Sequence, residues 1–246
     1  MRAARAFVQL LTPQLSLCTR IKVELFGSLA LTGRGHATDR AIILGLCGYE
    51  PATIEPTEIE RILADVRANG YLSVLDKAIP FAESTDLEFK KRESLPTHPN
   101  GMQFSAFDNN ELIAQATFFS IGGGAIVQEG AASCEDLSVH PTPAFPFSTA
   151  AELLSIARNR CLAIADVVRA NERAWRPEER TQDFLQAIHK TMHESIARGC
   201  FVDGILPGGL GVRRRAPSMN EALQRESSST DPYPCNGPGR PVRPSR

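Results

Sequence analysis

The sequence predicts an α+β protein, because a strand, a β-hairpin and several amphipathic helices can all be recognised in it. The strand is the apolar-rich run at residues 21–26, and the hairpin covers residues 101–121. Helical spacing of apolar residues dominates from residue 149 onward. We therefore expect an N-terminal domain of sheet and helices, then a helical segment and a disordered tail.

The composition is that of an ordinary globular chain. Of the 246 residues, 42% are hydrophobic and 22% are charged, and the formal net charge is -1. A charge so near zero gives no reason to expect nucleic acid or an anionic membrane surface as a partner. No apolar run reaches the roughly 18–20 residues that a bilayer span needs. The N-terminus also lacks a signal-peptide pattern, so we expect a cytoplasmic protein.

The six cysteines are dispersed, at Cys18, Cys47, Cys134, Cys161, Cys200 and Cys235. No compact pair of the C-x-x-C type occurs among them, whereas zinc sites and iron–sulfur clusters usually take ligands from such pairs. The spacing therefore favours free or buried thiols in a reducing compartment. We assign no metal ligand.

The elements of the N-terminal half follow from local patterns. Residues 3–12 have helical periodicity that ends at Thr12-Pro13. The strand at 21–26 runs into a glycine-broken polar loop over residues 27–35, and a helix begins on Thr38 or Asp39. A further helix follows residues 55–57 and stops at Asn69-Gly70. Residues 71–99 have an irregular, polar pattern.

The remaining elements are a hairpin and three helices. In the hairpin, residues 108–110 form the turn. Residues 125–140 are expected to be a loop or a short strand. Thr149 and Glu152 fit a capping box for the first helix, the second spans about residues 162–174, and the third follows Pro177 and ends at Gly199. Residues 226–246 contain many prolines and serines and no apolar run, which predicts disorder.

The strand–loop–helix unit at residues 22–50 is the best candidate for a site. His36 lies in its glycine-rich loop with Asp39 close by in sequence, and a histidine beside a carboxylate can be held in one tautomer and serve as acid or base. The helix start offers free N–H groups and a partial positive charge to an anionic or small polar ligand. The alternative is a loop histidine that merely caps the following helix.

His98 is a second candidate, in the turn just before the hairpin. Pro96 and Pro99 stiffen this turn, and Asn100-Gly101 permits positive φ. A histidine fixed in this way, with Asn100 beside it, can hydrogen-bond a small substrate. The alternative is a turn histidine in solvent.

Three further motifs have simpler interpretations. The run at residues 122–124 is all glycine but lacks the Lys-Ser/Thr of a P-loop, so a strand exit or close backbone packing is favoured. His189 and His193 lie four apart on a helix, yet no third metal ligand is evident and a surface face is favoured. The arginines at 213–215 could dock phosphates, but a solvated linker is the preferred interpretation.

Five motifs, in this order along the chain, together resemble the iron–sulfur L-serine dehydratases (L-serine ammonia-lyases). They are G-S-L-A-L-T-G-R-G-H-A-T-D at 27–39, L-P-T-H-P-N-G-M at 95–102, F-S-I-G-G-G at 119–124, F-P-F-S-T-A-A-E at 145–152 and G-I-L-P-G-G at 204–209. The resemblance extends from Met1 to about Gln224.

The resemblance implies a β domain similar to a regulatory substrate-binding domain of some bacterial phosphoglycerate dehydrogenases. A helical catalytic domain would hold a [4Fe-4S] cluster, one iron of which acts as a Lewis acid on the serine hydroxyl. A base removes the α-proton, and the aminoacrylate product hydrolyses to pyruvate and ammonia. The family's role would lie in serine catabolism and gluconeogenesis.

In the matching positions, His36 and His98 are the catalytic candidates. We add Thr32, Asp39 and Asn100 as substrate-binding candidates. L-serine is the expected substrate, and the expected partners are a second copy in a homodimer or a separate catalytic domain or subunit.

The chain also departs from the family pattern. The Ser-Ser-Ser-His-Thr segment that precedes the position of Met1 is absent, and a proline-, serine- and arginine-rich tail stands where the catalytic domain should follow Leu223. No cysteine matches a cluster ligand. We therefore expect an N-terminal fragment, with a β domain at 1–145, a helical segment at 146–210 and a linker and tail at 211–246. This fragment is expected to be inactive alone; a non-catalytic module that binds a small amino or hydroxy acid is the alternative.

Overall fold

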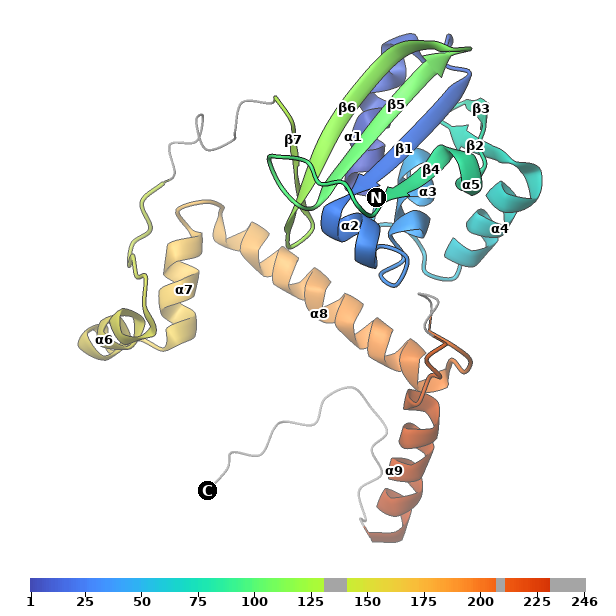
Figure 1. Ribbon diagram of the computed structural model, residues 1–246. Coiled ribbons are helices and arrows are strands. Elements are labelled where there is room, and N and C mark those ends of the chain that lie inside the picture. Colours follow the sequence, from blue (N-terminus) through green and yellow to red (C-terminus); the bar gives the residue numbers. More distant parts are fainter. Residues whose placement is uncertain (131–140, 207–210, 231–246) are drawn as a thin grey trace. The chain divides into compact units, whose positions relative to one another are not determined.

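The computed structural model describes residues 1–130, 141–206 and 211–230, with side chains described up to residue 225. The chain divides into two compact units, one built on Met1–Asp136 with Leu206–Gly211 and the other on Leu137–Ile205 with Val212–Arg246. The first unit contains the sheet, and the second contains helices, so the predicted α+β class is confirmed (Figure 1). Each unit is described by itself.

The first unit is organised around a five-stranded sheet in the order β4-β1-β5-β6-β7 (Figure 1). Its strands are β1 (Arg20–Phe26), β4 (Leu87–Lys90), β5 (Gly101–Asp108), β6 (Glu111–Gly122) and β7 (Ala125–Gln128). β1 lies between β4, to which it is parallel, and β5, to which it is antiparallel. The predicted strand and hairpin are therefore confirmed, and the hairpin turn is completed by Asn109 at φ 52°.

One face of the sheet carries the core. Alternate residues of β1, namely Ile21, Val23 and Leu25, are fully buried there beneath α1 (Arg2–Leu11) and α3 (Thr38–Leu46). The ring of Phe7 from α1 stacks on Phe104 of β5, with centroids 5.4 Å apart. The same core continues through α4 (Ile59–Asn69) and the hairpin of β2 (Tyr71–Val74) and β3 (Lys77–Pro80). α1 continues into a short 3-10 turn, Thr12–Gln14.

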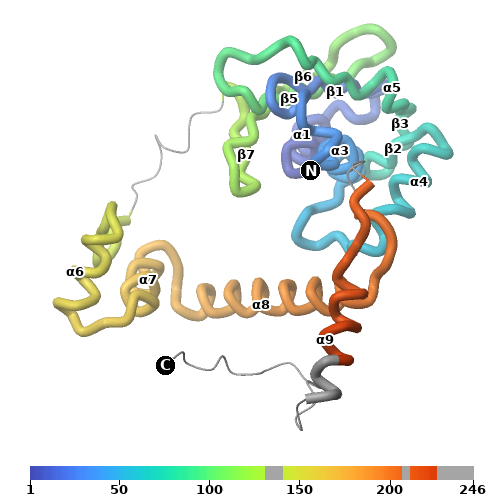
Figure 2. Tube along the Cα trace, turned by 60° about the horizontal axis from the view of Figure 1, so that its bottom comes forward, coloured from blue at the N-terminus to red at the C-terminus, as the bar shows by residue number. Residues whose placement is uncertain are grey.

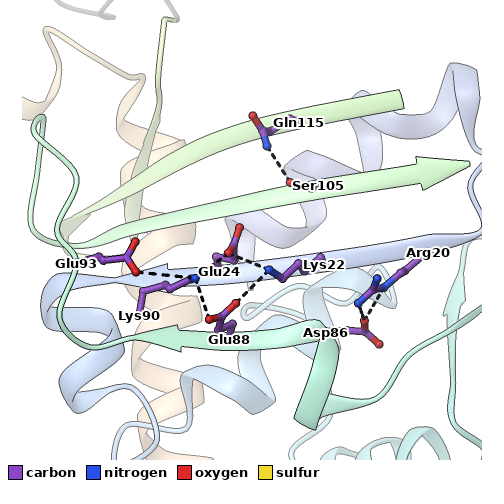
Figure 3. Close-up of polar contacts among 9 residues, drawn as sticks. All are labelled: Arg20, Lys22, Glu24, Asp86, Glu88, Lys90, Glu93, Ser105 and Gln115. Carbon is purple, nitrogen blue, oxygen red and sulfur yellow. Dashed lines mark hydrogen bonds and ion pairs between the residues drawn. The ribbon is translucent and has the colours of Figure 1, made fainter. Parts of the chain in front are cut away.

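The opposite face of the sheet carries a closed ring of ion pairs across β1 and β4 (Figure 3). Lys22 Nζ lies 3.0 Å from both Glu24 Oε1 and Glu88 Oε2. Lys90 Nζ lies 2.8 Å from Glu88 Oε1 and 3.5 Å from Glu24 Oε1. The hydrogen bond from Lys90 is the largest cause that lowers the pKa of Glu88, and the bond to Glu24 is the largest that raises the pKa of Lys22.

Two predictions for the first unit were wrong. The segment after Phe26 is a short helix, α2 (Gly27–Thr32), where the glycines predicted a loop. Residues 71–99 hold β2, β3, the four-residue helix α5 (Glu83–Asp86) and β4, where the pattern predicted irregular structure. Elements of four residues are too short to show a clear period, and β4 exists only through its pairing with β1.

The second unit consists of α6 (Ala150–Arg160), α7 (Ile164–Glu172), α8 (Glu178–Phe201) and α9 (Ala216–Thr230). The predicted capping box is present, because Thr149 Oγ1 accepts from the Glu152 N–H at 3.2 Å and Glu152 Oε2 accepts from the Thr149 N–H at 3.2 Å. Gly199 does not end α8 as predicted. A glycine inside a helix costs only about 1 kcal/mol relative to alanine, which a long helix tolerates.

The predicted disordered tail falls mostly on residues outside the described ones, since residues 231–246 are not among them. Residues 226–230, however, form the last turn of α9 and are helical. Within the described ranges, no helix combines the length and the apolar character that crossing a membrane requires.

Candidate functional site

The topology brings three of the motif-bearing segments to one end of the sheet. β1 and the parallel β4 end there together, with Phe26 opposite Lys90, and β5 begins there, with Met102 opposite Leu25. β6 returns to the same end, with Phe119 opposite Gly101. Residues 27–37, the loop at 91–100 and the glycines at 122–124 therefore all leave the sheet at this end (Figure 1).

His98 and Asn100 form one directly connected group. The backbone N–H of Asn100 donates to His98 Nδ1 at 3.1 Å. Because Nδ1 accepts, the proton of the neutral ring lies on Nε2, which can donate to a ligand. The half-buried ring of His98 also lies against Phe119, with ring centroids 6.3 Å apart. The turn therefore fixes both the tautomer and the orientation of this histidine.

Asn100 anchors the loop to β6. Its side-chain Nδ2 donates to the Ser120 carbonyl at 3.2 Å, and the Ser120 N–H donates to the Asn100 carbonyl at 3.0 Å. Within the described part of the chain, Asn100 Oδ1 makes no hydrogen bond and so remains available as an acceptor. The residue thus holds the loop in place and also offers a polar atom.

The start of α2 holds the same loop from the other side. The Gly27 N–H donates to the Glu93 carbonyl at 2.8 Å, and the Ser28 N–H donates to the Pro99 carbonyl at 2.9 Å. Gly27 has φ +51°, and a Cβ added to it would lie 2.3 Å from the Pro99 oxygen. Only glycine combines this conformation with so close an approach, and the approach sets the position of the residue next to His98.

Thr32, His36 and Asp39 are close in sequence, along the chain that leaves α2, but no side-chain contact among the described residues joins them; we call them the second group. His36 is exposed in the turn after this helix, and its backbone N–H donates to the Thr32 and Gly33 carbonyls, both at 3.2 Å. Thr32 Oγ1 donates to the Ser28 carbonyl at 2.8 Å, so the hydroxyl proton is already used while its lone pairs are free. Among the described residues, no hydrogen bond reaches the His36 ring, and none joins it to Asp39.

Asp39 lies in the first turn of α3 and has an unusual carboxylate. Its Oδ1 is buried and has no hydrogen-bond partner among the described residues. A buried acceptor of this kind is rare in native proteins and calls for a donor. The pKa of Arg67 is raised chiefly by its hydrogen bond to Glu83 and, to a smaller extent, by the charge of Asp39, but Arg67 does not bond to Asp39.

The turn that carries His36 is packed against β4. Gly33 lies so close to Phe89 that an added Cβ would meet the Phe89 ring at 3.1 Å and Thr38 Cβ at 3.3 Å. The Arg34 guanidinium lies over the same ring, 5.0 Å from its centroid. The two groups of candidate residues are therefore both fixed to the sheet end, and α2 connects them. Within the described residues, no hydrogen bond joins the side chains of one group to those of the other.

Phe119, Ser120 and the Pro99 carbonyl were not among the predicted site residues. Phe118 and Phe119 are each 2% exposed, and adjacent strand residues point to opposite faces of a sheet. Two consecutive buried phenylalanines were therefore a signal that both faces of β6 are covered near this end. The roles of the Ser120 and Pro99 backbones carry no sequence signal of their own.

The described cysteines do not fit an iron–sulfur cluster, which requires several thiolates close together. Cys18 is buried with its Sγ 3.5 Å from the Arg20 carbonyl, and burial raises its pKa and that of Cys47. Cys161 and Cys200 lie in the second unit. No group of three histidine, cysteine or acidic side chains among the described residues could hold a metal. Cys134 and Cys235 lie outside the described residues.

The other motifs keep a structural role in the described residues. His189 and His193 place ring nitrogens 3.0 Å apart on exposed α8, with no third ligand there. The glycines at 122–124 all have positive φ and form the turn from β6 to β7, where the Arg2 guanidinium donates to the Gly124 carbonyl at 2.7 Å.

This arrangement defines a class: an α+β domain in which several polar candidate residues lie on segments that leave one end of its sheet. Residues 1–131, more than half of the chain, match the serine dehydratase beta chain family, and the chain belongs to that family.

Similar full-length proteins extend the match beyond these residues. L-serine dehydratase of Streptomyces coelicolor is 38% identical over 231 residues, which are 92% of this chain and 51% of that protein. L-serine dehydratase 1 of Escherichia coli is 35% identical over 240 residues, covering 94% and 52% of the two chains. L-serine dehydratase of Mycobacterium tuberculosis is 38% identical over 237 residues, covering 94% and 51%. The chain spans about half the length of the curated relatives it matches.

Proposed function

We propose that this chain supplies one half of the active site of an L-serine ammonia-lyase, which converts L-serine to pyruvate and ammonia. The observation that carries the proposal is the bond from the Asn100 N–H to His98 Nδ1, at 3.1 Å. It prepares a histidine with a defined tautomer at the sheet end, in a member of the serine dehydratase beta chain family. The relatives named above are L-serine dehydratases, which supports serine as the substrate.

The two histidines have different surroundings, and we assign them different roles. His98 donates its Nε2–H to an oxygen of bound serine and orients the substrate. The His36 ring, to which no described residue bonds, accepts the α-proton and acts as the base. The Cβ–O bond then breaks, the electron pair of the C–H bond forms the double bond, and His36 returns its proton to the departing hydroxide, which leaves as water. Hydrolysis of the resulting 2-aminoacrylate gives pyruvate and ammonia.

Three further residues are proposed to bind the substrate. The carboxylate charge of Asp39 suits the ammonium group of serine; its Oδ1 is enclosed in this structure and has no donor among the described residues. Asn100 Oδ1 and the lone pairs of Thr32 Oγ1 are two further acceptors, on the same two segments as the histidines. The acceptors suit the protonated amine, and His98 Nε2–H suits an oxygen of the substrate.

The [4Fe-4S] cluster implied by the resemblance does not fit the described cysteines, so we place its ligands outside the described part of this chain. The second half of the enzyme would complete the site. The free cysteines Cys18, Cys47, Cys161 and Cys200 support a reducing compartment, and we place the protein in the cytoplasm.

The test is a complementation assay. This chain is combined with the part of the S. coelicolor enzyme that lies outside the match, under anaerobic iron and sulfide reconstitution, and pyruvate is measured from L-serine. Loss of an acid–base group typically lowers the rate by about 10²–10⁴-fold, so we expect such a loss for His36→Gln. For His98→Gln we expect a higher KM as well as a lower kcat.

The control is Asp76→Asn, because Asp76 is exposed in the β2–β3 turn, away from the candidate residues and from α8. Turnover that survives His36→Gln, or that falls equally with Asp76→Asn, would contradict the assigned roles. If the chain binds L-serine by NMR titration but no combination forms pyruvate, the alternative holds: a module that binds small amino or hydroxy acids. The partnerless Oδ1 of Asp39 is the observation that favours this alternative.

A further inference from the structure

The second unit contains an amphipathic helix whose apolar side is left largely exposed by the other described helices of that unit. In α8, Phe184, Ile188, Met192 and Ile196 recur every four residues and share one face of the helix. The exposed fraction is 41% for Ile188 and 62% for Ile196, with Phe184 and Met192 between these values. We call these four residues the α8 apolar face.

The opposite side of α8 is polar. It carries Glu179, Asp183, Lys190 and Glu194. A helix with a polar side and an apolar side normally buries the apolar side against another element. In α8 the only buried residue is Thr181. The sequence therefore specifies a packed helix, while the described residues leave its apolar side open.

The second unit supplies little cover, and one contact it makes with this face is polar: the Arg176 guanidinium lies over the Phe184 ring, 5.6 Å from its centroid. Only Ala157 and Val167 are buried hydrophobic side chains in its described residues, so this unit lacks a core of ordinary size. α7 lies at the N-terminal end of α8, and α9 lies at its C-terminal end (Figures 1 and 2). Large contiguous apolar surfaces on soluble proteins usually mark an interaction site.

The relatives indicate what the cover is. Their match covers 92–94% of this chain, so fewer residues lie outside it than the 24 residues of α8, and at least part of α8 is matched. The same match covers only 51–52% of the relatives. In those proteins a helix equivalent to α8 therefore belongs to a polypeptide with another half of similar size.

We propose that the α8 apolar face docks the second half of a serine dehydratase, meaning a polypeptide equivalent to the part of the relatives outside their match with this chain. The inference deepens the proposed function, on which it rests only for the identity of this partner. A second copy of this chain is the competing occupant, but the relatives give no separate reason to expect it. Docking would place the second half against the second unit, which follows the residues of the sheet-end site in sequence.

The test is co-purification. The full chain, carrying an affinity tag, is co-expressed with the untagged second half of the S. coelicolor enzyme. We expect the two to purify in a 1:1 ratio, and Ile188→Lys combined with Met192→Lys to reduce the recovered partner at least tenfold. The control is Leu112→Lys, because Leu112 on β6 is 49% exposed and lies in the other unit.

Any of the following outcomes would overturn the proposal. The partner could fail to co-purify, or remain insoluble in the presence of the wild-type chain. The double variant could retain the partner, or Leu112→Lys could release it equally. If light scattering instead showed a dimer of the tagged chain that the double substitution abolishes, the α8 apolar face would be assigned to a second copy. Pyruvate formation is read separately, so a bound but inactive pair rejects the serine chemistry and leaves the docking intact.

Discussion

Gly27→Ala should disturb the loop that carries His98, and the structure sets the magnitude. Gly27 has φ +51°, and alanine in this left-handed region costs about 1–2 kcal/mol. Its Cβ would also lie 2.3 Å from the Pro99 oxygen, so the backbone of the loop must move. Such overpacking adds about 1–3 kcal/mol. The two contributions together predict a loss of about 2–5 kcal/mol in the free energy of unfolding.

The matched control is Gly70→Ala. Gly70 has φ +72° but no atom within 4 Å of an added Cβ, so only the conformational part, about 1–2 kcal/mol, applies. Urea unfolding should be followed by far-ultraviolet circular dichroism, because the single tryptophan, Trp175, lies in the second unit. ¹⁵N shifts of the His98 ring should move in Gly27→Ala and stay in Gly70→Ala. Equal stability losses in the two variants would refute the reasoning.

Three further predictions concern the loop, the ion-pair ring and the thiols. Asn100→Pro removes the backbone N–H that donates to His98 Nδ1, so the ¹⁵N shifts of the His98 ring should report more of the Nδ1-protonated tautomer. Asn100→Ala keeps this N–H and should keep the wild-type tautomer. Identical shifts in the two variants would contradict the assigned tautomer. Glu88→Gln should lower stability at neutral pH and less so in 1 M salt, as measured by urea unfolding. Folding lowers the pKa of Glu88, so ionised Glu88 contributes fully to the free energy of unfolding above its ordinary pKa of about 4.3. This contribution disappears as the pH falls through the lowered pKa of the folded state. A stability difference between Glu88→Gln and the wild type that persists at pH 2 would contradict this explanation. Iodoacetamide at pH 8 should modify exposed Cys161 before Cys47, whose thiol pKa is raised by burial, and equal rates by mass spectrometry would contradict that burial.

The sequence predicted the elements whose signals are local. The hairpin of β5 and β6 follows from alternation on both sides of the Asp108–Asn110 turn, and the start of α6 follows from its capping box. β4 could not be predicted in this way, because its four residues pair with a strand more than sixty positions earlier, as in Val23 opposite Leu87. The β2–β3 turn places Leu75 at φ 51°, without the glycine or asparagine that normally signals such a turn.

In the candidate site, too, some features follow from local sequence and others depend on pairing between distant segments. His98 and Asn100 lie close together because only two peptide bonds of a stiff proline turn separate them, and in the structure they are joined by a hydrogen bond. The hydrogen bonds between Asn100 and Ser120 depend on the pairing of β5 with β6. The hydrogen bond from the Ser28 N–H to the Pro99 carbonyl depends on β1 and β4 ending at the same edge. Backbone carbonyls carry no residue identity, so sequence patterns cannot reveal that they hold a loop.

The unequal distribution of buried surface between the two units has a consequence for assembly. The first unit has a continuous core from α1 through the sheet to the β2–β3 hairpin, and its loop at 91–100 is held by backbone hydrogen bonds from both α2 and β6. If this is the binding site we propose, it would be formed before any partner arrives, which would lower the ordering cost of binding. Among its described residues the second unit buries only a few apolar side chains, so we expect its helices to gain stability when the α8 apolar face is covered. Assembly should therefore change the exchange of amide hydrogens strongly in α8 and little in the loop that carries His98. Strong protection of both regions on docking would mean that the sheet-end site is formed by the partner rather than presented to it.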